Sequence, residues 1–268
     1  MTKSPKEAGT EKRILEKLKG KPLILAKEIF SDPEIIHLQN YANTVSITRL
    51  NYNDHGPVHM KRVAYNSIKI MSILHEQGFK FSLEKEGAGT YEESLNAVLS
   101  ASLIHDIGMS IGRENHEKNA LILADPILRR ILKKVYPDDF EKQVIVRALA
   151  FECISGHMGT LKVHSYEAGV VLIADGCDME KGRSRIPIMI NDEPKPGDIH
   201  QYSSAAIEKV TITKGENKPL AITVEMSASV GFFQIEEVLF RKINASTLKP
   251  FIELSAGVTG KETKRYLH

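Results

Sequence analysis

Six histidine and aspartate side chains stand at the ends of apolar helical segments, where a polar group is unusual. In the stretch "LNAVLSASLIHDIGMS", the spacing of the leucines places His105 and Asp106 on the inward-facing side of a helix that is expected to end at Gly108. A buried carboxylate without a partner costs several kcal/mol, which forces pairing, protonation or metal binding. The remaining polar residues of this kind decide among these three outcomes.

Four further residues share the context of this pair. His59 opens an apolar helix, Asp175 ends the apolar stripe of "EAGVVLIADGCDM", His116 starts "NHEKNALILAD", and His157 directly follows "ALAFECIS". A single buried histidine is more often a hydrogen-bonded core residue than a ligand. Helix ends can nevertheless converge on one cavity of a bundle. Imidazoles and carboxylates together suit iron, manganese, zinc or cobalt, so the set predicts a metal site.

Positioning such residues requires a helical scaffold, and helical periodicity dominates from about residue 10 to residue 180. Breaks fall where Gly, Pro, Asn and Asp gather, as in "NYNDHGP" and "VYPDD". The fold class predicted is therefore mainly α. The expected helices cover residues 11–20, 33–50, 57–77, 91–107, 115–124, 126–135, 139–154 and 163–180.

The pattern changes near residue 200, which divides the chain into a helical domain, 1–200, and a small α+β tail, 201–268. The tail predicts strand, strand, helix and strand, in "IEKVTITKGENKPLAITVEMS", "FFQIEEVLFRKI" and "PFIELSAGV". A core of this size is marginal by itself, so we expect the tail to pack on the helical domain or on a second copy. Its free strand edges favour a homodimer.

The composition is that of an ordinary soluble globular protein, with 42% hydrophobic and 26% charged residues. A net charge of +2 gives no reason to expect a nucleic-acid partner. The apolar runs are too short to cross a bilayer and the N-terminus lacks a signal peptide, so a cytoplasmic protein without a membrane partner is expected. Cys153 and Cys177 lie in apolar helical contexts without CxxC spacing, which favours buried free thiols.

The segments "HMKRV", "IHDIG" and "LIADGCDM", in this order, resemble the first His, the His-Asp pair and the final Asp of the HD-domain metal-dependent phosphohydrolase superfamily. The resemblance covers about residues 50 to 190. The two further histidines, His116 and His157, resemble the branch of this superfamily that has a six-ligand two-metal site. The resemblance implies one metal held by His59, His105, Asp106 and Asp175, and a second held by His116 and His157, with Asp106 bridging.

The function that this resemblance implies is a metal-dependent phosphohydrolase, either a phosphomonoesterase or a phosphodiesterase. It would cleave a phosphate ester of a nucleotide or another small phosphorylated metabolite through a hydroxide that bridges two divalent transition-metal ions, Mn, Fe, Zn or Co. Asp106, His55 and Arg113 are the candidate catalytic residues. His55 is expected either to contact a phosphate or act as a general acid near the metals, or to cap the "NYNDHGP" turn.

The sequence departs from the two-metal relatives that cleave cyclic dinucleotides. Met109 stands where those relatives have a lysine after the glycine of "HDIG", and no "GYP" occurs, so that activity is not expected. Either the substrate differs, or another cation takes the place of the lysine, with Arg113, Arg183 and Arg185 as candidates because guanidinium binds phosphate oxygens bidentately. Asp178, close behind Asp175, is a candidate for orienting a ligand histidine.

Two other functions are compatible with the same residues. In some relatives with this resemblance, the six-ligand set holds two irons that activate dioxygen, so a di-iron oxygenase is the first alternative. The second is a non-catalytic regulatory domain with a structural metal and a tail that binds a partner. The arrangement of ligands for two adjacent ions favours catalysis, because a structural role requires only one.

Overall fold

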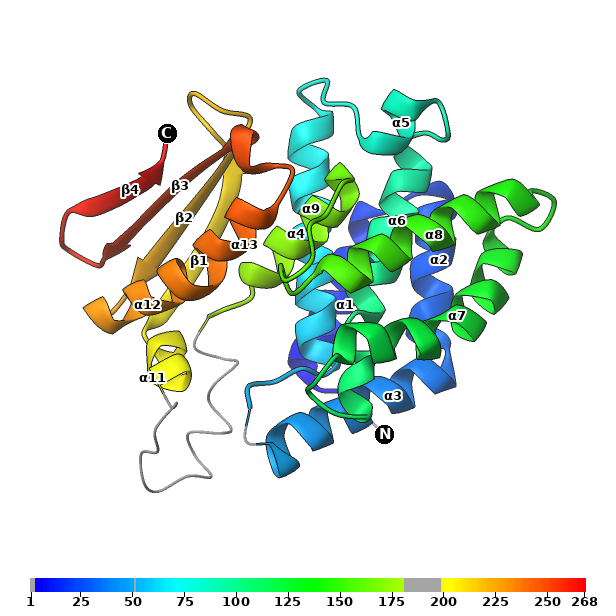
Figure 1. The fold of residues 1–268 in the computed structure, drawn as a ribbon, viewed down its shortest axis with the longest axis horizontal. Helices are drawn as coiled ribbons and strands as arrows, with labels where there is room; N and C mark the ends of the chain where they lie inside the picture. The colour runs from blue at the N-terminus through cyan, green and yellow to red at the C-terminus, as the bar shows by residue number, and fades with distance from the viewer. Residues whose placement is uncertain (1–2, 51, 181–198) are drawn as a thin grey trace.

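The computed structural model describes residues 3–50, 52–180 and 199–268, and it is a helical protein followed by a small four-stranded sheet (Figure 1). The predicted mainly α fold with an α+β tail is confirmed at this level. The helices of the first part are α1 (Pro5–Lys17), α2 (Gly20–Ser31), α3 (Pro33–Thr44), α4 (Pro57–His75), α5 (Ser82–Glu86), α6 (Tyr91–Ile104), α7 (His116–Val135), α8 (Phe140–Gly156) and α9 (Tyr166–Gly176).

Helix α6 is the centre of the helical part. It begins at a capping box, in which the Glu93 carboxylate accepts a hydrogen bond of 2.9 Å from the backbone N–H of Thr90. Every residue from Glu93 to Ile104 is buried, because α2, α4, α8 and α9 all pack against this helix. The end of α6, where His105 and Asp106 follow, therefore lies inside the protein.

The sequence prediction did not include helix α2 or the short helices α5 and α11 (Ile199–Ala205), and it divided α7 into two. Helix α2 was not expected, because its flanks are basic, yet Leu25 and Ile29 are buried in the core. Helix α7 is continuous through Pro126, where two separate helices were predicted. The proline removes the hydrogen bond to the carbonyl of Ile122, which lies on the solvent-facing side of α7, since the Ile122 residue is 71% exposed. Water can solvate that carbonyl, so the helix need not end there.

Gly108 does not end helix α6 as predicted. The α-helix ends at Ile104, and Ile107–Ser110 form a 3-10 turn, η2, that packs against α7. A Cβ atom at Gly108 would lie 1.9 Å from the carbonyl oxygen of His116. The glycine is therefore needed for the close approach of η2 to the start of α7 rather than for a left-handed helix stop.

The C-terminal unit consists of α11 (Ile199–Ala205), a four-stranded sheet and a helical crossover. The expected boundary near residue 200 lies at the start of α11. Strand β1 (Ile207–Lys214) pairs antiparallel with β2 (Leu220–Met226), which pairs parallel with β3 (Ile252–Val258). The crossover from β2 to β3 runs through α12 (Phe232–Gln234), η4 (Ile235–Leu239) and α13 (Phe240–Ala245).

A fourth strand, β4 (Thr263–Leu267), pairs antiparallel with β3, and the sequence analysis did not include it. Its three leading residues, Thr263, Lys264 and Arg265, are exposed, so the strand lacks the alternation of apolar residues that reveals a half-buried strand. Charged residues on an edge strand oppose pairing with another sheet edge.

The C-terminal unit packs directly on the helical part. Helix α13 contacts α9, while β1 and β2 contact α4, so both the crossover and the sheet lie against the helical part (Figure 1). Ile235, Leu239 and Ile243 of the crossover are fully buried. The expected packing of the tail on the helical domain is present, and the two ligand-bearing helices α4 and α9 form that contact.

Both cysteines, Cys153 and Cys177, are buried free thiols, as predicted. Burial raises the pKa of each thiol, which keeps it protonated and unreactive. Every helix among the described residues is too short or too polar to cross a membrane.

Candidate metal centre

The six predicted ligand residues lie together in one buried cluster, although they come from five helices or helix ends. On one side of the cluster, His59 Nε2 lies 3.2 Å from His105 Nε2 and 3.2 Å from Asp175 Oδ1. Ligand atoms of these three residues all lie within 4.8 Å of one another. We call His59, His105 and Asp175, together with the facing oxygen of Asp106, the first subsite.

On the other side of the cluster, His116 Nε2 lies 3.1 Å from His157 Nε2. These two nitrogens are 3.3 and 3.4 Å from Asp106 Oδ1. The other oxygen of the same carboxylate, Oδ2, lies 3.3 Å from His59 Nε2 and 3.4 Å from His105 Nε2. We call His116, His157 and Asp106 Oδ1 the second subsite, so Asp106 offers one oxygen to each subsite.

Helix ends bring these side chains together. His105 directly follows α6, His116 is the first residue of α7, and His157 directly follows α8. His59 lies in the first turn of α4 and Asp175 in the last turn of α9. Backbone groups at helix ends have no partner within the helix, so a polar side chain there can bond to them.

Hydrogen bonds donated by Nδ1 fix the orientation of three of the imidazole rings. The Nδ1 atoms of His105, His116 and His157 lie 3.0, 2.9 and 2.6 Å from the carbonyl oxygens of the residues three positions earlier. A carbonyl oxygen accepts only, so each Nδ1 carries the proton and donates it. These three residues are Ser102, Arg113 and Ile154.

The fourth ring, His59, donates from Nδ1 to a carboxylate. Asp178 Oδ2 lies 2.7 Å from His59 Nδ1, and Arg62 Nε lies 2.8 Å from the other oxygen of Asp178. Asp178 therefore orients the His59 ring. A carboxylate in this position also raises the basicity of the ring nitrogen that faces the cluster.

This hydrogen bonding tests whether a metal fits the site. With the proton on Nδ1, each neutral ring presents the lone pair of Nε2 toward the cluster. Two such lone pairs face each other in each subsite, at 3.2 and 3.1 Å, beside a carboxylate oxygen. Lone pairs and carboxylates repel one another unless a cation lies between them. The donor set therefore fits a transition metal bound by imidazole and carboxylate.

The protonation states of His157 and Asp106 also suit a metal site. Burial lowers the pKa of His157 to about 4, against the opposing effect of the Asp106 carboxylate, so the imidazole is neutral at pH 7. Burial acts to raise the pKa of Asp106, but the surrounding imidazoles, His105 foremost, hold it well below its ordinary value. A neutral imidazole at His157 and an ionised carboxylate at Asp106 are the forms of these two residues that bind metal.

We expect the metal-free protein to lose stability as the pH falls from 6.5 to about 4, because the folded state binds the His157 proton less readily than the unfolded chain. Because the pKa of His157 is lowered in the folded state, its contribution to the free energy of unfolding is complete above pH 6.5. The contribution is lost as the pH falls, since the unfolded chain binds the proton more readily. The loss is on the order of 3 kcal/mol. Urea unfolding of chelator-treated protein at pH 7, 5.5 and 4.5 measures it.

The variant His157→Gln is the control for this pH dependence. Its free energy of unfolding should fall less steeply over the same range, since the variant lacks the titrating ring. Equal slopes for the variant and the parent protein would show that His157 does not cause the effect. The carboxylates of Asp106 and Asp175 titrate below this window, because their pKa values lie below the ordinary 3.8.

One residue at the cluster was missed by the sequence analysis. Lys242, on α13 of the C-terminal unit, forms an ion pair through Nζ with Asp175 Oδ2 and donates a hydrogen bond of 2.9 Å to the carbonyl oxygen of His157. Burial acts to raise the pKa of Asp175, but the charge of Lys242 together with the interactions of His59 and His105 outweighs it, and the pKa is well below its usual value. A signal did exist, because Lys242 follows Ile235 and Leu239 at helical spacing on the buried stripe.

The candidate catalytic residues lie at the margin of the cluster. The ring centroids of His55 and His59 are 5.8 Å apart, and His55 Nδ1 lies 2.6 Å from the carbonyl oxygen of Asn53. The Arg113 guanidinium lies over the ring of Tyr52, 5.7 Å from its centroid, while the Arg113 carbonyl accepts the His116 proton. Arg183 and Arg185 lie outside the described residues.

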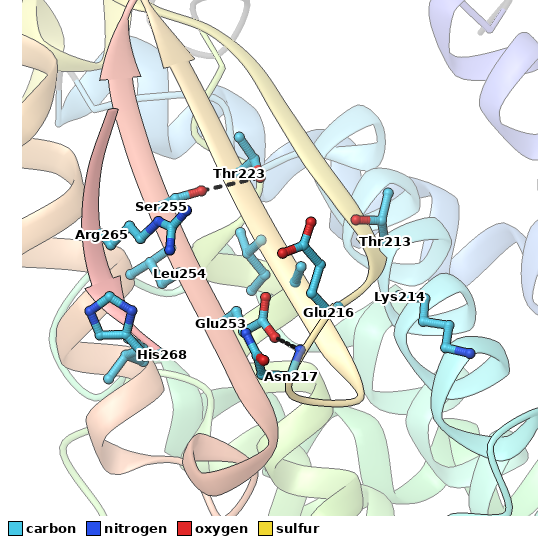
Figure 2. Close-up of a pocket in the computed structure, with 14 residues that line it drawn as sticks. Thr213, Lys214, Glu216, Asn217, Thr223, Glu253, Leu254, Ser255, Arg265 and His268 are labelled. Carbon is cyan, nitrogen blue, oxygen red and sulfur yellow. Dashed lines mark hydrogen bonds between the residues drawn. The ribbon is translucent and has the colours of Figure 1, made fainter. Parts of the chain in front are cut away.

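An open pocket of about 260 Å³ lies on the outer face of the sheet, and its lining includes none of the six cluster residues (Figure 2). The Glu253 carboxylate in this pocket accepts a hydrogen bond of 2.7 Å from the backbone N–H of Lys218 and a second one from Asn217. Thr223 and Ser255 bond to each other through their hydroxyls across β2 and β3. These polar groups stabilise the β1–β2 turn and the sheet.

Comparisons with known proteins identify a similar protein that is itself uncharacterized. No family model matches the chain, and no solved structure matches it. Uncharacterized protein MJ1020 from Methanocaldococcus jannaschii is 39% identical over 244 residues, which cover 91% of this chain and 92% of the relative. The similarity spans the helical part and the C-terminal unit together, and the chain therefore belongs to the same family as MJ1020.

Proposed function

We propose that this protein is a metal-dependent phosphohydrolase of the HD-domain superfamily that uses two divalent transition-metal ions. The position of Asp106 carries the proposal, since one carboxylate oxygen faces the nitrogens of His59 and His105 and the other faces those of His116 and His157. A carboxylate shared in this way suits two adjacent cations. A site for a single structural ion requires no second pair of imidazoles.

The net charge of the loaded site favours an anionic substrate. Four neutral imidazoles and the carboxylates of Asp106 and Asp175 would hold the two divalent ions, so about two positive charges remain uncompensated, and Lys242 lies beside them. When bound, such ions lower the pKa of water and neutralise charge on phosphate oxygens. A phosphate ester of a nucleotide or another small metabolite is the substrate class that we propose.

Two residues at the margin would serve this substrate. His55 is the candidate proton donor to the departing alcohol, which would take the Nε2 proton of the imidazolium form, because Nδ1 already donates to the Asn53 carbonyl and the ring lies beside that of His59. Arg113 is the candidate ligand for a phosphate oxygen, although this requires its guanidinium to leave the face of Tyr52. Both assignments rest on the proposed reaction.

The proposal predicts hydrolysis that depends on metal and does not consume dioxygen. Protein purified with manganese should contain two ions per chain and should release p-nitrophenol from p-nitrophenyl phosphate or from the bis-ester. A chelator should abolish turnover and added Mn²⁺ should restore it, because only the loaded site is cationic. Elemental analysis, absorbance at the p-nitrophenolate band and an oxygen electrode measure these three quantities.

Two histidine variants, one at the cluster and one on the surface, provide the matched control for this assay. His116→Ala removes a ligand of the second subsite, whereas His37→Ala changes an exposed histidine of α3 and should leave turnover intact. Oxygen consumption by the iron-loaded protein in place of hydrolysis would favour the oxygenase. Two bound ions without turnover on either ester or oxygen would favour a regulatory domain.

A further inference from the structure

Lys242 contacts the cluster but belongs to a different structural unit than the six candidate ligand residues. It is carried by α13 of the C-terminal crossover, whereas all six ligand residues belong to the helical part. Its side chain is only 11% exposed. A lysine is rarely buried without partners, so the contacts that hold its ammonium group define its role.

Two glycines accommodate the stem of this lysine. A Cβ atom at Gly176, the last residue of α9, would lie 3.2 Å from Lys242 Cδ, and one at Gly159 would lie 3.9 Å from Lys242 Cγ. The methylene groups therefore run between the end of α9 and the loop after α8. This close packing fixes the path of the side chain toward the cluster.

The ammonium group contacts one ligand residue of each subsite. In the first subsite it pairs with Asp175 Oδ2, while Asp175 Oδ1 faces His59 at 3.2 Å. The lysine thus occupies one carboxylate oxygen and leaves the other directed at the metal position. In the second subsite, the ammonium group donates a hydrogen bond of 2.9 Å to the carbonyl oxygen of His157. The Nε2 atom of that histidine faces His116.

From these contacts we infer that the C-terminal unit is part of the metal centre. Lys242 is the positioning residue through which this unit fixes the Asp175 carboxylate and the backbone of His157. This inference rests on the metal centre of the proposed function. Asp175 without the lysine would be free to rotate or to offer both oxygens, and the backbone at His157 would lose a bond. Partners that orient metal ligands in this way contribute about 10- to 100-fold to metal affinity.

The test is a titration of the metal-free full-length protein with Co²⁺, read by visible absorption, which reports both affinity and ligand geometry. Lys242→Met keeps the length of the stem and removes the charge, and we expect it to bind Co²⁺ about 10- to 100-fold more weakly than the parent protein. Lys242→Arg retains a cation and should restore much of this loss together with the parent spectrum.

The neighbouring variant Arg241→Met is the matched control, since Arg241 is exposed and pairs with Glu237 on its own helix. It should bind Co²⁺ as the parent does. Equal affinity and equal spectra for Lys242→Met and Arg241→Met would overturn the inference. Thermal unfolding of each metal-free variant checks the fold, and Lys242→Gln, which keeps a hydrogen-bond donor without charge, replaces Lys242→Met if that variant does not fold.

The same titration separates the two proposals. Parent protein that binds two Co²⁺ ions but hydrolyses no phosphate ester would contradict the phosphohydrolase, while the comparison of Lys242→Met with Arg241→Met would still decide the role of the lysine. Parent protein that binds no Co²⁺ would contradict both. Normal hydrolysis with unchanged Co²⁺ affinity in Lys242→Met would contradict the positioning role alone.

Discussion

Replacing Asp106 with Ala should abolish phosphate-ester hydrolysis and leave fewer than two metal ions per chain. This residue is 2% exposed, and one of its carboxylate oxygens faces each subsite. Its loss would remove a ligand from each of the two proposed ions and would leave four imidazoles and the Asp175 carboxylate to hold them. Metal ions supply several kcal/mol of transition-state stabilisation, so kcat/KM should fall by at least about a thousandfold.

Elemental analysis and kcat/KM on p-nitrophenyl phosphate measure this effect. Asp138→Ala, which changes an exposed aspartate between α7 and α8, should retain full metal content and activity. The metal-free forms of both variants should have similar circular dichroism spectra, since α6 is held by its apolar contacts. An Asp106→Ala variant with two ions bound at parent affinity would contradict the shared role of the carboxylate.

Replacing Gly108 with Ala should destabilise the protein by about 3 kcal/mol or more, which corresponds to a fall in Tm of about 6–12 °C. The new methyl group would lie 1.9 Å from the His116 carbonyl oxygen and 2.5 Å from the Ala120 backbone nitrogen. Neither atom can move without shifting the first turn of α7. Since that turn carries His116, the variant should also bind metal more weakly at the second subsite.

Gly9→Ala is the matched control for this substitution. Gly9 lies in α1 with nothing within 4 Å of its Cβ position, so the change should be neutral or should stabilise the protein by about 0.5–1 kcal/mol. Differential scanning calorimetry of the two variants measures both effects. A Gly108→Ala variant that melts at the temperature of the parent would show that η2 and α7 can separate without cost.

The helical pattern of the sequence indicates the six candidate ligands, and the family resemblance alone suggested how they divide between two sites. Each of the six interrupts an apolar stripe at a helix end, and this local signal identifies His59 or Asp175 without knowledge of their neighbours. Which ring nitrogen faces inward depends on acceptors such as Asp178 and the Ile154 carbonyl. Those contacts arise only when the helices pack, so the orientation of each ring could not be predicted from the sequence.

Long-range packing also explains the elements that were missed. Helix α2 contacts the core through only part of its surface, and the exposed residues of β4 show no alternation, so their patterns are weak locally. Lys242 was missed because its partners, Asp175 and His157, lie in the other part of the chain. The interpretation of Gly108 as a helix stop was wrong because the constraint comes from α7 rather than from α6.

The ligands of the cluster are widely separated along the chain, from His59 in α4 to Asp175 in α9. Cations bound by them would close long loops as a covalent cross-link does, and would disfavour every partly opened conformation. Binding to the folded form alone adds its free energy to that of folding. Resistance to proteases would therefore track the supply of metal, and starvation for the ion would lower the abundance of the protein as well as its turnover.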